Sequence, residues 1–153
     1  MITGALVGWL VFTLSAPVTP SMTTVMTESE IQELYGPLLP IYFGQVQMRA
    51  SVADTPLSRQ QGLSNTPSLP TGIVKLFVLE EPGPAPFWMK DMNYPIDILW
   101  LDSDKTIIYI APDVAPETYP QTFGPLVDSL YVIETPAGFA DRAGMVVGEQ
   151  FVW

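Results

Sequence analysis

The hydrophobic pattern of this chain changes near residue 45. Up to Met26 the sequence has no charged side chain, and residues 2–16 are almost continuously apolar. From Val46 to Val52, apolar residues alternate with polar ones, which is the period of a β-strand with one face in solvent. The pattern therefore separates an apolar leader from a folded part that begins with a strand.

Further short apolar runs predict more strands. They cover residues 74–79, 86–91, 96–101, 106–110, 131–133 and 150–153. The runs 96–101 and 106–110 are apolar at both odd and even positions, so we expect both strands to lie centrally in the sheet. Between them, residues 102–105 have the composition of a solvated hairpin loop.

Helix start signals occur three times. Thr27 and Glu30 have the spacing of a capping box, which predicts a helix to about Tyr35. Thr55-Pro56 predicts a helix over 56–61, and Thr135-Pro136 predicts a third that ends near Gly144. The fold class is α+β and β-dominated: a compact curled or barrel-like mixed sheet of about six short strands with two or three short helices, plus an N-terminal apolar helix.

The sequence pattern predicts three parts of the chain. Residues 1–26 are interpreted as a signal peptide or an N-terminal membrane anchor with a spacer, because the apolar run is shorter than the roughly 20 residues of a comfortable membrane span. The alternative is a buried core helix. Residues 27–44 are a short helix and linker, and residues 45–153 form the β-rich domain. We expect an exported protein, periplasmic or extracellular, with or without a membrane tether.

Composition limits the chemistry. The 153 residues include no cysteine and no histidine, which removes thiolate nucleophiles, histidine bases and cysteine or histidine metal sites. A net charge of −10 argues against nucleic acid as a partner. We expect no cofactor and no metal.

The segment Phe87-Trp88-Met89-Lys90-Asp91 holds the most unusual cluster of residue types. Lys90 beside Trp88 could clamp an anionic ligand. Alternatively, Trp88 fills the core and Lys90 pairs with a carboxylate such as Asp97. The second interpretation predicts that Lys90 matters more for stability than Lys105, which lies in the solvated loop.

Four other residues are weaker candidates for a site. Asp54 is expected to cap the helix that begins at Pro56, and Arg59 to bridge to a carboxylate one turn later. Glu134 ends a predicted strand. Tyr119 lies in the proline-rich loop 111–128, where it could line a pocket.

Taken in order along the chain, these segments resemble the domain-of-unknown-function 192 family. The resemblance covers residues 46–152 and is most specific in Phe87-Trp88-Met89-Lys90 followed by Pro95-Ile96-Asp97. It implies a small β-rich domain, often exported, with no established activity. By position, the signature residues here are Asp54, Arg59, Gly62, Phe87, Trp88, Met89, Lys90, Pro95, Asp97, Glu134 and Gly138. The family usually has Asn-Thr where this chain has Asp91-Met92, and Met where this chain has Ser64.

Three functions fit these observations. The first is a noncatalytic extracytoplasmic module that binds an unknown small ligand or an envelope protein, in a cleft between the Trp88/Lys90 strand and the loop 111–128. The second is an envelope-associated hydrolase or lyase with Lys90 and Asp97 as acid–base partners. The third is an assembly factor that docks on a membrane protein. An open polar pocket joining Lys90 to Asp97 would favour the enzyme.

Overall fold

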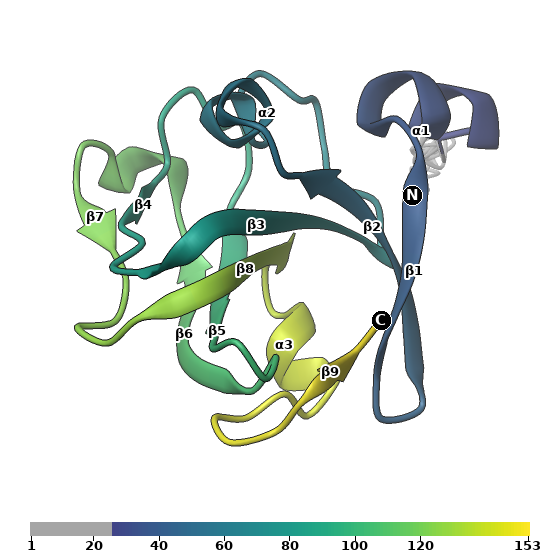
Figure 1. Cartoon of the computed structure of the whole chain (residues 1–153). Helices are drawn as coiled ribbons and strands as arrows, with labels where there is room; N and C mark the ends of the chain where they lie inside the picture. Colours follow the sequence, from purple (N-terminus) through teal and green to yellow (C-terminus); the bar gives the residue numbers. More distant parts are fainter. Residues whose placement is uncertain (1–25) are drawn as a thin grey trace, which may run out of the picture.

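The computed structural model describes residues 26–153, which form a strongly curled β-sheet with short helices around it (Figure 1). The predicted apolar leader lies outside the described residues except for Met26. Within residues 26–153, no helix is both long enough and apolar enough to span a membrane. The β-dominated α+β fold predicted from the sequence is confirmed.

The helices are short and the strands carry the architecture. The helices are α1 (Glu28–Tyr35), α2 (Pro56–Gln61), α3 (Phe139–Arg142) and the single 3₁₀ turn η1 (Pro116–Thr118). The strands are β1 (Leu38–Phe43), β2 (Val46–Ala53), β3 (Ile73–Gly83), β4 (Phe87–Trp88), β5 (Ile96–Leu101), β6 (Ile107–Val114), β7 (Thr122–Phe123), β8 (Ser129–Pro136) and β9 (Phe151–Val152).

Seven strands form one mixed sheet in the order β6-β5-β8-β3-β2-β1-β9. Only β2 and β3 pair in parallel, and α2 lies in the connection between them. The sheet curls until its two ends meet, since Thr106 forms a bridge with Gln150 and the amide of Ile107 donates to the carbonyl of Glu149. The result is a half-barrel whose two end strands are linked by these few contacts. The small strands β4 and β7 pair separately at the side of the molecule away from α1 (Figure 1).

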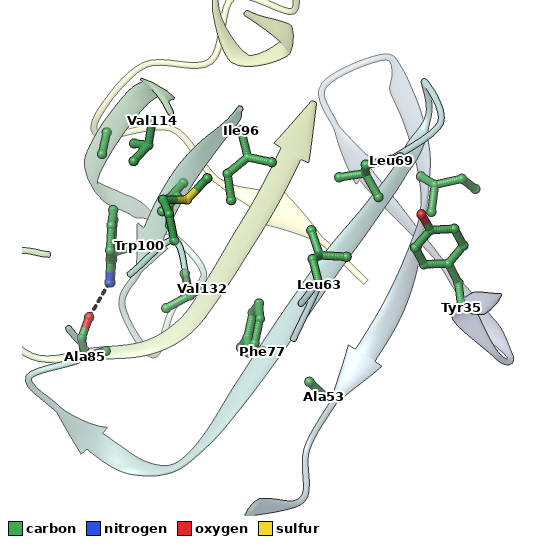
Figure 2. Packing of buried hydrophobic residues seen from close by; sticks show 14 of the residues in the cluster. Tyr35, Ala53, Leu63, Leu69, Phe77, Ala85, Ile96, Trp100, Val114 and Val132 are labelled. Carbon is green, nitrogen blue, oxygen red and sulfur yellow. Dashed lines mark hydrogen bonds between the residues drawn. The ribbon is translucent and has the colours of Figure 1, made fainter. Parts of the chain in front are cut away.

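Each face of the sheet has its own hydrophobic core, as the alternation of side chains along β5 illustrates. Leu99 and Leu101 point into the curl, where they join a cluster that includes Ile41 and Phe151. Ile96, Ile98 and Trp100 belong to the outer cluster, which α1 and the segments around Leu63 and Met89 cover. Figure 2 shows this outer cluster, with the Trp100 indole N–H donating to the carbonyl of Ala85 at 2.7 Å.

Local capping signals are confirmed for the first two helices. Thr27 and Glu30 form the predicted capping box of α1, and Gly36 ends that helix with a φ of 70°. Thr55 caps α2, with Pro56 at its first position and Gly62 after its last. Because Thr55 is the capping residue, the prediction that Asp54 caps this helix is wrong.

The third capping prediction is also wrong. Thr135 and Pro136 continue β8, where Thr135 is fully buried, and α3 begins only at Phe139 after Gly138. The structure also adds a strand within the predicted linker, since β1 occupies residues 38–43. Pro40 obscures this strand in the sequence. It is tolerated because β9 pairs only with Tyr42 and Phe43, so at Pro40 β1 is an edge strand.

Two predicted strands are placed differently from expectation. The segment 86–91 is strand only at Phe87 and Trp88, which pair with β7 outside the main sheet. The strand after the hairpin loop, β6, stands at the end of the sheet order, whereas β5 is central and completely buried as predicted. The first residue of β6 is nevertheless paired, since Ile107 exchanges backbone hydrogen bonds with Gly148 and Glu149, just before β9.

Candidate functional site

A cavity of about 330 Å³ opens between α2 and β4 and extends down to the outer face of the main sheet. One wall consists of α2 and the residues after it, Arg59 to Ser64. The opposite wall is the segment from Pro84 to Trp88, together with Lys90 and Met92. Phe77, Leu79 and Glu134 contribute from β3 and β8. We call this the Glu134 cavity.

The base of the cavity adjoins a row of polar side chains on three neighbouring strands. Ser51 on β2 stands opposite Lys75 on β3, and Lys75 stands opposite Glu134 on β8. The ammonium group of Lys75 donates to Oγ of Ser51 at 3.0 Å, and Oγ of Ser51 donates to the carbonyl of Tyr35 at 2.6 Å. Ser51 is therefore buried under α1, although the alternation along β2 predicted it on the solvent face.

Glu134 is the exception in this row because its carboxyl group lacks a partner. The residue is 4% exposed, and Oε2 makes no hydrogen bond within the described part of the chain. Burial raises the pKa of Glu134 to about 8, and the nearby charge of Lys75 only partly opposes this rise. Burial also lowers the pKa of Lys75. At neutral pH the Glu134 side chain is thus mostly a carboxylic acid that can both donate and accept a hydrogen bond.

A second polar contact lies beside this row. The hydroxyl groups of Thr66 and Tyr94 are 2.5 Å apart, and Oγ of Thr66 also donates to the carbonyl of Leu63. Burial raises the pKa of Tyr94, so its phenol stays protonated and remains a hydrogen-bonding group. These bonds hold the loop after α2, which forms one cavity wall, against the segment before β5.

Arg59 fixes the α2 wall to the sheet. Its guanidinium group donates to the carbonyls of Asp54 and Val78 at 2.7 and 2.9 Å and forms an ion pair with Glu80. The predicted bridge from Arg59 to a carboxylate is confirmed. At the turn after α2, a Cβ on Gly62 would come within 3.3 Å of the Phe77 ring, at a φ of 50° that favours glycine. Arg59 and Gly62 therefore shape the cavity.

The opposite wall carries Trp88 and Lys90 toward the solvent. Trp88 is 52% exposed, so the prediction that it fills the core is wrong. Its ring lies against Tyr119 with 5.7 Å between the centroids. Because β4 pairs with β7 in the loop 111–128, the space predicted between these segments is occupied by their own pairing. The cavity lies instead on the side of Trp88 that faces α2, and Tyr119 does not line it.

Lys90 and Asp97 do not form the predicted pair. Asp97 is fully buried, and its carboxylate accepts hydrogen bonds from the amides of Asp113, Gly138 and Ala140 at 2.9, 3.0 and 2.9 Å. Lys90 is exposed, and its ammonium group makes no hydrogen bond or ion pair within residues 26–153. Asp97 points to the inner face of β5, toward α3, whereas Lys90 lies at the cavity on the outer face of the sheet.

Four of the seven candidate residues thus meet at one cavity, namely Arg59, Trp88, Lys90 and Glu134. Asp54, Asp97 and Tyr119 do not line it. The sequence pattern did not point to Ser51, Lys75 or Tyr94 around the base of the cavity. The available signal was a charged residue inside each of two apolar strands, Lys75 and Glu134, since such charges need partners when buried. Within the described part of the chain, no cluster of three or more acidic side chains is placed to hold a metal ion.

Comparison with known proteins places this geometry in a family. Residues 42–153 match the DUF192 family, described as "Uncharacterized ACR". A UPF0127 protein from Thermococcus sibiricus is 29% identical over 105 residues, which cover 69% of this chain and 66% of that protein.

Two crystal structures share the fold. A protein of unknown function from Novosphingobium aromaticivorans has a TM-score of 0.71 and 25% identity, over 76% of this chain and 85% of its own. A proposed transcription regulator from Sinorhizobium meliloti has a TM-score of 0.69 and 26% identity, over 74% of this chain and 89% of its own. Since the family match covers well over half of the chain, from the last two residues of β1 to Trp153, the chain belongs to the DUF192 family.

Proposed function

We propose that this chain is a noncatalytic binding domain that takes a small organic molecule into the Glu134 cavity. A volume of about 330 Å³ is within the size range of small-molecule sites, and such sites combine apolar walls with a few polar groups. Phe77, Phe87 and Trp88 supply aromatic surface here.

One observation carries the proposal: Glu134 lines the cavity, and its buried Oε2 has no hydrogen-bond partner among residues 26–153. Leaving a buried polar group unpaired costs on the order of 1–3 kcal/mol. A ligand that supplies the missing partner would recover this free energy on binding, so the vacant hydrogen bond favours occupation of the cavity.

The positions of the reactive groups favour binding over catalysis. The pair proposed for an envelope hydrolase or lyase, Lys90 and Asp97, is separated, and both Asp97 oxygens are held by backbone amides. Ser51 and Lys75 do touch, but Ser51 is 1% exposed, donates to a backbone carbonyl and does not line the cavity. A nucleophile in that position has no access to a substrate.

Methionine methyl groups provide a test in the full-length protein. Met92 lines the cavity, whereas Met48 lies in the core on the other face of the sheet. In protein labelled with ¹³C at the methionine methyl groups, a fragment library of small organic molecules should contain compounds that shift Met92 and leave Met48 unchanged.

Two Glu→Met variants, whose side chains keep a similar length, distinguish binding in the cavity from binding elsewhere on the surface. Glu134→Met removes the unpaired carboxyl group. It should lower the affinity for the selected compounds about tenfold, because one hydrogen bond to a buried group is lost. Glu149→Met, at an exposed position away from the cavity, should leave affinity unchanged. A library in which no compound shifts Met92, or equal affinity in Glu134→Met, would refute the proposal.

We also propose that the domain acts outside the cytoplasm. The support is the uncharged apolar run of residues 2–16 and its Thr/Pro/Ser-rich spacer. Residues 1–30 fused to alkaline phosphatase, which is active only after export, should give active enzyme in a bacterial host. Activity no higher than that of the phosphatase without a leader would contradict export.

A further inference from the structure

The Glu134 cavity has a different character at each end. At the inner end, Glu134 is 4% exposed and offers an unpaired carboxyl group. At the mouth, Lys90 is exposed and its ammonium group is unpaired within the described residues. A molecule that enters between α2 and β4 therefore meets a cation at the surface and a hydrogen-bonding group at depth.

The other cation at the cavity is not available to a ligand in the same way. Arg59 already donates to two backbone carbonyls and to Glu80, whose charge balances it. Asp91 is exposed beside Lys90, but it lines a neighbouring surface hollow and not the cavity itself. Lys90 is thus the group at the mouth that a ligand charge can pair with.

The surface between the two ends suits a ring. Phe77 and Phe87 meet edge to face with 4.8 Å between their centroids. Leu79 and Met92 add aliphatic surface, and Trp88 forms the rim. Aromatic rings pack favourably in edge-to-face and offset arrangements against such walls.

The inner end does not attract a cation. Burial favours the neutral form of Glu134 at neutral pH, and Lys75 stands on the neighbouring strand. A ligand ammonium group at that depth would face the positive charge of Lys75 and a carboxyl group without charge. A hydroxyl group meets neither penalty, since it can exchange a hydrogen bond with a carboxylic acid.

From this arrangement we propose that the ligand of the Glu134 cavity is a small aromatic carboxylic acid with a hydroxyl group at the end remote from its carboxylate. The carboxylate pairs with Lys90, the ring lies against the wall formed by Phe77, Phe87 and Trp88, and the hydroxyl group bonds to Glu134. This inference rests on the proposed binding function and specifies the class of ligand.

Three matched probes test the ligand class against the full-length protein. They are p-hydroxyphenylacetate, phenylacetate, which lacks the hydroxyl group, and tyramine, which replaces the carboxylate by an amine. Dissociation constants come from the Met92 methyl shift. We expect p-hydroxyphenylacetate to bind about tenfold more tightly than phenylacetate, and tyramine to bind more weakly than either acid.

Variants assign each end of the ligand to its residue. In Glu134→Met the two acids should bind equally, because the hydroxyl group has lost its partner. Lys90→Met should weaken the binding of both acids by the same factor and should not weaken that of tyramine, whose ammonium group Lys90 repels. Lys90→Arg should restore binding of the acids. Arg142→Met, an exposed cation that does not line the cavity, is the control and should change nothing.

The outcomes separate this inference from the proposed function. If tyramine binds more tightly than the acids, or if Lys90→Met leaves the acids unaffected, the ligand class is wrong while a binding cavity stands. If Glu134→Met lowers the affinity for both acids by the same factor, the hydroxyl group of the ligand does not bond to Glu134. If none of the three probes and no compound of the fragment library shifts Met92, both proposals fail.

Discussion

Glu134 shows how a single residue can be typical in sequence and unusual in the fold. It ends an apolar run, as many strand-terminal glutamates do, but the structure buries it beside Lys75 with one carboxyl oxygen unpaired. The charged form is disfavoured there: burial raises the pKa of Glu134 to about 8, and the charge of Lys75 only partly opposes this rise.

This shift predicts a pH dependence of stability. The pKa of Glu134 rises from 4.5 to about 8 on folding, so between these values the folded state holds more protons than the unfolded state. The free energy of unfolding should therefore fall as the pH rises through this window, by at most about 1.4 kcal/mol per pH unit from this group.

Urea denaturation of wild type and Glu134→Gln between pH 5 and 8.5 measures this contribution. Lys75, Tyr35 and Tyr94 face the same region, and all three remain in the variant, so the difference between the two curves isolates Glu134. The variant should lose this downward slope. Parallel curves for the two proteins would show that Glu134 is ionised in the folded state.

At the scale of elements, Asp97 joins three parts of the fold. It lies on β5 and accepts amide hydrogen bonds from Asp113 of β6, from Gly138, which caps α3, and from Ala140 within α3. The N-cap residue of the four-residue helix α3 is Gly138, which has no side chain to accept a hydrogen bond from the first amides of the helix. The carboxylate of Asp97 takes this role from another strand, where its negative charge also suits the positive end of the helix.

Asp97→Ala should therefore cost about 3–5 kcal/mol of stability, because it leaves buried amides unpaired. Asp97→Asn, which keeps one carbonyl oxygen as an acceptor, should cost less. Asp128→Ala, at an exposed position, is the control and should change the urea midpoint little. A cost below about 1 kcal/mol for Asp97→Ala would contradict this role.

Closure of the sheet is a property of the whole molecule. The last residues of the chain reach both ends of the sheet, because β9 pairs with β1 while the amide of Phe151 donates to the carbonyl of Lys105. The ammonium group of Lys105 donates to the carbonyl of Trp153 at 2.9 Å and lies 4.3 Å from the centre of its ring. Lys105 thus connects the hairpin loop to the C-terminus.

This contact predicts a stability order opposite to the one expected from the sequence. Lys105→Ala should lower the free energy of unfolding by about 1 kcal/mol, since it removes a hydrogen bond and a cation–π contact. Lys90→Ala should change it by less than about 0.5 kcal/mol, because the Lys90 ammonium group has no partner in the part of the chain that the structure describes. Thermal melting of both variants checks this order. A larger loss for Lys90→Ala would restore the original prediction.

By itself, the sequence determined the features that depend on near neighbours. The capping box of α1 joins residues three apart, and the alternation of β2 from Val46 to Ala50 and the loop 102–105 are equally local. These features formed as predicted because neighbouring residues meet in almost any compact arrangement. The order of the matching segments along the chain likewise indicated the family.

Only the tertiary structure decided which distant residues share a site. Asp97 and Gly138 are 41 residues apart in the chain, and Lys75 meets Glu134 across two antiparallel strands. Strand order determines such contacts, and a strand pattern in the sequence does not contain it. The curl of the sheet placed Asp97 on the inner face and Glu134 in an outer cavity, so two carboxylates that look alike in sequence have opposite roles.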